Sequence, residues 1–259
     1  MNILDFGFAG LEAQLWQLLF LSIRSGAAML AAPMIGGAAV PVQLRILLSL
    51  VFGVFIATWL PLAPAPEMMS FAAILAILQE VLIGAAMGFV LQLAFAIPLV
   101  AAEQISGTMG LAIATSIDPS SGSQSGALGS YFSITLTLLF YAIGGHLLWF
   151  QLLIESHNLL PPGGFAFGAD NALSIVMFMG YALATAAAIA LPVVLVLLMV
   201  QIVTGVISRS APALNLFALG LPSGVLAGIG ALIIVMPIII DQLARVIEVA
   251  LGEIARLAS

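Results

Sequence analysis

The 259-residue chain contains no cysteine and no lysine, and it has only two histidines. Without cysteine it can form neither disulfides nor thiolate metal sites. Its five basic residues are all arginines, and eleven acidic residues bring the net charge to −6. Nucleic-acid binding and polybasic lipid binding both require a cluster of basic residues. The composition therefore excludes a nucleic-acid partner.

Charge of either sign is scarce, since only 6% of the residues are charged and 63% are hydrophobic. A soluble domain carries about 25% charged residues, and so few charges cannot cover a surface that faces water. The composition predicts an integral membrane protein. The first residues include Asp5 and Glu12 and no positively charged region, so we expect no cleaved signal peptide.

Six apolar stretches predict an all-α membrane protein of about six long, partly broken helices in a single domain over residues 1–259. The third and fifth stretches would span roughly 45 and 54 Å as straight helices, more than a bilayer crossing needs. They must either project beyond the bilayer or break, and proline can break or kink a helix at Pro98, Pro192 and Pro237. The stretches are 11–33, 42–60, 71–100, 127–154, 172–207 and 213–240.

The few residues that could carry out chemistry do not form a catalytic pattern. His146 and His157 are too far apart to be ligands on adjacent turns of one helix, and a metal site needs three or four such groups. The serines around 120–125 have Asp118 nearby but no histidine, whereas a hydrolytic triad needs a base beside its nucleophile. We therefore expect no enzyme activity, no metal and no cofactor.

Arg24 and Glu80 lie inside apolar stretches, and Glu103 follows one. A charge near the middle of a bilayer costs about 2.5–3.5 kcal/mol on insertion scales, so it is normally paired or faces water. We expect Arg24 to pair with either Glu80 or Glu103. The pair would be a structural link between helices or subunits, or else part of a proton or ion relay.

Four glycines form two G-x-x-x-G pairs, Gly84 with Gly88 and Gly224 with Gly228. Glycines at this spacing let helix backbones approach closely. The pairs indicate tight packing, either inside the chain or against a neighbour. The density of small residues favours a subunit of a larger assembly.

Residues 107–126, GTMGLAIATSIDPSSGSQSG, separate two apolar stretches. Asp118–Pro119 stops any helix, because the residue before a proline is driven out of the α region. The apolar part is too short to cross a bilayer, and non-helical backbone at that depth must lie inside protein or beside a water-filled cavity. The segment therefore lines or blocks a cavity, or it is a short interfacial helix followed by a loop.

Three blocks of the chain resemble the FliR family of flagellar biosynthetic proteins and its injectisome counterparts. They are AEQISGTMGLAIATSIDPSSGSQSGAL, GGHLLWFQLLIESHNLLPPGG and SRSAPALNLFALGLP. Arg24, Val40–Pro41 and LIGAAMGF at 82–89 also sit where that family places similar residues. The resemblance runs over nearly the whole chain in the same order.

The resemblance implies a subunit of the type III protein export gate in the bacterial inner membrane, at the flagellar basal body. It implies a FliP-like part fused to a FliQ-like hairpin. The partners would be FliP-like, FliQ-like and FlhB-like subunits, the lipid bilayer and unfolded export substrates in transit. The family's loop that matches residues 106–120 is a channel plug, so we expect a plug loop at about 106–122. Its candidate residues are Gly107, Met109, Gly110, Leu111, Ile113, Ser116, Asp118 and Pro119.

Two other functions compete with the export gate. A secondary transporter or small-solute channel would build its site from broken helices near the bilayer midplane. Such a protein should show inverted repeats and a cluster of polar residues at mid-span, and the sequence shows neither. A purely structural scaffold with an inert loop is the third interpretation.

Overall fold

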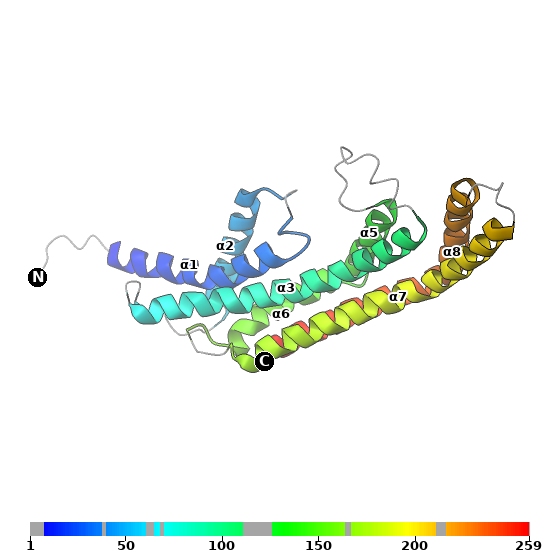
Figure 1. The fold of residues 1–259 in the computed structure, drawn as a ribbon. Coiled ribbons are helices and arrows are strands. Elements are labelled where there is room, and N and C mark those ends of the chain that lie inside the picture. Colours follow the sequence, from blue (N-terminus) through cyan, green and yellow to red (C-terminus); the bar gives the residue numbers. More distant parts are fainter. Residues whose placement is uncertain are drawn as a thin grey trace, which may run out of the picture. The chain divides into compact units, whose positions relative to one another are not determined.

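The computed structural model describes residues 8–37, 40–60, 65–67, 70–110, 126–163, 167–210 and 216–258. These residues form helices and no strand (Figure 1). The predicted all-α fold is confirmed. The helices are α1 (Phe8–Ala31), α2 (Val42–Trp59), α3 (Phe71–Thr108), α5 (Ala127–Ala142), α6 (Gly145–Leu159), α7 (Ala169–Ser210) and α8 (Leu216–Leu257).

Four helices of the described chain are long and apolar enough to cross a membrane, namely α2, α3, α7 and most of α8. The pair α5 and α6 would make a fifth span if the two are taken together. Helix α1 is not in this set, and Gln14, Gln17 and Arg24 make it more polar than the others. The described helices thus supply four or five candidate spans where the sequence predicts about six.

Helices α3 and α7 run unbroken for 38 and 42 residues, which corresponds to about 57 and 63 Å at 1.5 Å per residue. Each continues through its internal proline, Pro98 or Pro192, and α8 continues through Pro222 and Pro237. The proline breaks considered from the sequence are therefore wrong for these helices. Both helices are longer than a hydrocarbon core of about 30 Å.

The chain bends instead inside the apolar stretch 127–154, where α5 ends and α6 begins at an angle of 66°. Gly144 separates the two helices and adopts a φ of +74°. Glycine takes this left-handed conformation readily because it has no Cβ. The stretch predicted as one apolar segment is two helices.

The chain divides into two compact units, each described by itself. The first comprises Met1–Leu93, Gly144–Phe178 and Val249–Ser259, and the second comprises Ala94–Ile143 and Met179–Glu248. In the first unit α2 packs closely on α1, because a Cβ added at Gly53 would lie 2.9 Å from the Leu18 carbonyl oxygen. The Trp16 indole nitrogen also donates a hydrogen bond of 2.7 Å to the Pro66 carbonyl.

Candidate functional site

In the first unit, Arg24 of α1 forms a buried ion pair with Glu80 of α3. The side chains are 0% and 1% exposed. Arg24 Nε donates to Glu80 Oε2 at 2.7 Å, and Arg24 Nη2 donates to Oε1 at 2.9 Å. This paired geometry suits the planar guanidinium group and the carboxylate. Glu103, the other partner considered for Arg24, is exposed on α3.

The remaining donors of Arg24 bind the C-terminal end of α6. Nη1 donates to the Ser156 carbonyl at 2.6 Å and to its hydroxyl at 3.0 Å, and Nη2 donates to the Leu160 carbonyl at 2.8 Å. All five N–H groups of the guanidinium thus have acceptors. The carbonyls at a helix end need partners, so Arg24 links three helices at once.

This arrangement favours a structural ion pair over a proton relay. The guanidinium group stays protonated in proteins, and its donors are already used by Glu80, Ser156 and Leu160. Ser156 and Leu160 were missed from the sequence. The two prolines at 161–162 mark a helix end there, and exposed carbonyls at a helix end commonly attract a cation.

The first glycine pair, Gly84 and Gly88, packs directly on the backbone of α1. A Cβ added at Gly84 would lie 2.1 Å from the Arg24 carbonyl oxygen, and one at Gly88 would lie 2.3 Å from the Ala28 carbonyl oxygen. No real Cβ atom tolerates such distances, so only glycine fits. Figure 1 shows α1 and α3 lying alongside each other in this region. The pair therefore serves packing within the chain.

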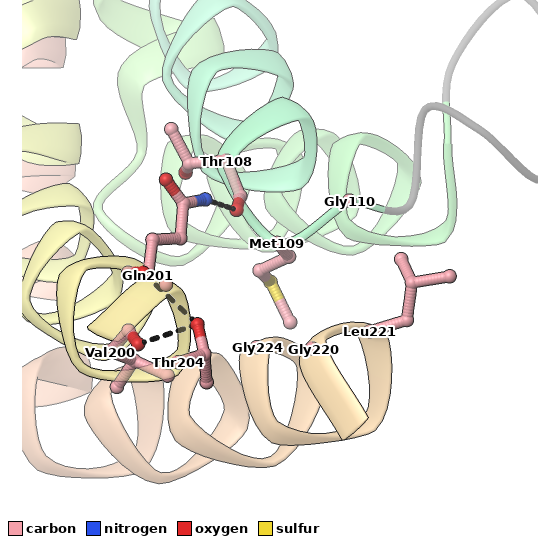
Figure 2. Close-up of a pocket in the computed structure, with 10 residues that line it drawn as sticks. Thr108, Met109, Gly110, Val200, Gln201, Thr204, Gly220, Leu221 and Gly224 are labelled. Carbon is pink, nitrogen blue, oxygen red and sulfur yellow. Dashed lines mark hydrogen bonds between the residues drawn. The ribbon is translucent and has the colours of Figure 1, made fainter. Parts of the chain in front are cut away.

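In the second unit, the end of α3 forms a small site with α7 and α8 (Figure 2). The helix continues to Thr108, so Gly107 belongs to its last turn and not to a loop as predicted. Met109 is only 4% exposed, and Figure 2 shows its side chain pointing from the end of α3 toward α8. Gly110 follows with a φ of +82°. The end of α3 is therefore well defined up to Gly110.

The second glycine pair, Gly224 and Gly228, faces this methionine. A Cβ at Gly224 would lie 3.3 Å from the Met109 carbonyl oxygen. A Cβ at Gly228 would lie 2.7 Å from both Cγ and Cε of Met109 and 2.8 Å from its sulfur. The side chain of Met109 thus fills the space that a side chain at Gly228 would occupy, and its backbone carbonyl lies close to Gly224.

One hydrogen bond from α7 also holds the end of α3. The Gln201 amide donates to the Thr108 carbonyl at 2.8 Å, which satisfies one of the carbonyls left free at the helix end. The sequence reasoning missed Gln201. Its signal was a polar amide in the apolar run of residues 193–207, where such side chains often bond across helices.

No group of three or more His, Asp or Glu side chains in the described ranges could hold a metal ion.

Five of the predicted plug residues lie outside the described ranges. The predicted plug residues outside those ranges are Leu111, Ile113, Ser116, Asp118 and Pro119. The described part of the expected plug is its N-terminal end, residues 106–110.

A family model described as bacterial export proteins, family 1, matches residues 15–250 of the chain. Among curated relatives, the flagellar biosynthetic protein FliR of Escherichia coli K12 is 33% identical over 80% of this chain and 79% of its own. FliR of Pectobacterium carotovorum is 31% identical, over 84% and 83%. The surface presentation of antigens protein SpaR of Salmonella typhimurium is 28% identical, over 73% and 71%.

These matches agree with the resemblance seen in the sequence blocks. They cover the helices on both sides of the Met109 site and the helices that Arg24 joins. The chain belongs to the bacterial export proteins, family 1, the family of the FliR proteins.

Proposed function

We propose that this chain is a membrane subunit of the flagellar type III export gate, where it helps to form and close the channel for unfolded flagellar proteins. The family match over residues 15–250 supports a role in export. The relatives at 33% and 31% identity are named for flagellar biosynthesis. Their names favour the flagellar form of the apparatus over the injectisome form.

The observation that carries the role as a subunit is the exposed apolar surface of α7. It runs from Leu173, which is 59% exposed, to Ile207, which is 46% exposed. At 1.5 Å per residue this is about 51 Å of helix. A helix tilted by 40°, the upper end of the usual range, fits only about 39 Å into a 30 Å hydrocarbon core. Lipid cannot cover the whole face, so other protein chains must cover the rest.

The partners that suit this face are other apolar export subunits. We assign FliP-like and FliQ-like chains to the sides of this subunit and an FlhB-like chain to the outside of the gate. The gate would lie in the inner membrane at the flagellar basal body. The exposed side chains on α7 are aliphatic and methionine residues such as Val176, Met177 and Met199. Association would bury them by van der Waals packing, as between membrane helices in general.

The proposed role in the channel belongs to the segment that begins at Met109. Its mostly apolar sequence up to residue 115, which includes Gly110, would form a deformable seal, because hydrophobic constrictions block ions by dewetting. Glycine permits the rearrangement that a passing chain requires. The structure describes the anchored end of this segment at Met109 and Gly110.

Isolating the chain from its native membrane tests the assignment as an export subunit. We expect one large complex in mild detergent that also contains FliP-like and FliQ-like chains. Deleting the gene should abolish both flagellar assembly and secretion of flagellar proteins into the medium. A chain that purifies alone or as a homodimer, in cells that still secrete these proteins, would favour the transporter interpretation instead.

Deleting residues 110–114 tests the seal. We expect the variant to assemble normally but to raise the ion conductance of the membrane several-fold, because the apolar part of the plug is lost. Deleting residues 120–124, which removes five polar or small residues from the same segment, is the matched control and should leak less. Unchanged conductance in a fully assembled complex of the 110–114 deletion would rule out this role.

A further inference from the structure

The two G-x-x-x-G pairs of the chain have different kinds of partner. Gly84 and Gly88 meet backbone atoms of a neighbouring helix, at distances that leave no room for any side chain. Gly224 lies near the backbone carbonyl of Met109 at the end of α3, and Gly228 meets the side chain of the same methionine. The first pair joins two long helices through their backbones, whereas the contact at Gly228 rests on one flexible side chain.

The contact of Met109 with α8 has features that suit release. Methionine is unbranched and has three rotatable bonds, so it can change conformation at little cost. Gly110 follows with a φ of +82°, a conformation that glycine adopts and leaves easily. The exposed side-chain amide of Gln201 on α7 holds the end of α3 through one hydrogen bond to the Thr108 carbonyl.

The site also contains space into which a side chain can move. A partly open cavity of about 260 Å³ lies beside Met109, between Thr108 at the end of α3, Thr204 of α7 and Leu221 of α8. Ligand sites for small molecules usually measure about 300–1,000 Å³, so this cavity is small for a ligand. Its size and position suit a rearranged methionine better.

We propose that Met109 is a latch, seated on Gly224 and Gly228 of α8 when the export channel is closed and released when it opens. The inference rests on the proposed function, because it assigns the latch to the anchored end of the channel-closing segment. The glycines are the seat, since a side chain at Gly228 would occupy the place of the methionine side chain and one at Gly224 would crowd the Met109 carbonyl. Gln201 holds the helix end in register with the seat.

A reversible disulfide between positions 109 and 228 tests the latch directly, because the chain has no cysteine of its own. In the variant M109C/G228C the sulfur at 109 takes the place of the methionine Cγ, which lies 2.7 Å from the Cβ position at 228. The two sulfurs can then reach the bond length of about 2.05 Å. An oxidant should close this bond in membranes, and loss of maleimide labelling measures its formation.

We expect secretion of flagellar proteins to fall to background when the bond forms and to return when it is reduced. The matched control is M109C/G230C on the same helix, because a Cβ at Gly230 has no neighbour within 4 Å and cannot bridge to 109. Its secretion should not respond to oxidant. Full secretion with the bond formed, or failure of the bond to form, would overturn the latch.

A second variant tests the seat without cysteine chemistry. Gly228→Ala places a methyl group where Met109 lies, so it should unseat the latch and raise ion conductance several-fold, whereas Gly230→Ala, two residues along the same helix, should not. Normal conductance in an assembled G228A complex would contradict the latch. Failure of the proposed function gives a different result, since deleting the gene would then leave flagellar secretion intact.

Discussion

Replacing Arg24 with methionine should sharply lower the stability of the first unit and the yield of the assembled complex. The change keeps a long side chain but removes all five donors, so the Glu80 carboxylate would stay buried without its partner. Breaking a buried ion pair in this way costs about 3–5 kcal/mol, a large part of the usual total stability of about 5–15 kcal/mol. The yield of intact complex in mild detergent and its Tm measure the effect.

Two further variants separate the charge from the hydrogen bonds. R24M/E80L removes both charges and should recover part of the lost yield, because a buried pair replaced by apolar side chains is often tolerated. It still leaves the Leu160 carbonyl without Arg24. R24K keeps the charge but offers three donors in place of five. Its Tm should therefore fall between those of the native chain and R24M. An R24M protein with native yield and Tm would show that the pair does not stabilise the fold.

Replacing Gly84 with alanine should destabilise the first unit although alanine is the better helix former. The added methyl group would lie 2.1 Å from the Arg24 carbonyl oxygen and 3.1 Å from Ala27 Cβ, so α1 and α3 would have to separate. Overpacking of this kind typically costs about 1–3 kcal/mol and occasionally more. The shift would also disturb Arg24 itself. A lower Tm and a lower yield of complex are the expected readouts.

Gly230→Ala is the matched control, because α8 offers open space at that position. In an exposed helix interior, alanine is about 0.8–1.0 kcal/mol more favourable than glycine. The control should therefore keep or slightly raise the Tm, while G84A lowers it. If both variants behave alike, close packing at Gly84 is not what limits stability.

Fold class and helix positions could be predicted from the apolar runs, because a membrane span leaves a long and simple pattern. Helix α2 at Val42–Trp59 lies almost where the stretch 42–60 predicts it. The bend between α5 and α6 was harder to predict. Proline is the usual signal for a break, but the helices continue through Pro98 and Pro192. The pair Gly144–Gly145 was the better signal, because kinks also occur where glycines weaken a helix.

For residues that interact across the fold, the sequence could narrow the candidate partners but could not select among them. Intramembrane charge picked out Arg24 and two candidate carboxylates, yet only the packing of α1 on α3 places Glu80 within 2.7 Å. Backbone acceptors such as the Leu160 carbonyl cannot be recognised from the sequence, because every residue type carries the same carbonyl group. The spacing of Gly224 and Gly228 indicated close packing, but that it receives a methionine from the end of α3 depends on tertiary structure.

The buried ion pair also imposes an order on the assembly of the helices during synthesis. Arg24 and Glu80 are 56 residues apart in the chain, and the Leu160 carbonyl is 136 residues from Arg24. At about 5–20 residues per second, a typical rate of synthesis, the carboxylate is made roughly 3–11 seconds after the arginine and the last acceptor roughly 7–27 seconds after it. During that interval the first helix carries a charge without its partner. Helix α1 can therefore reach its final environment only after α3 and the end of α6 have been made.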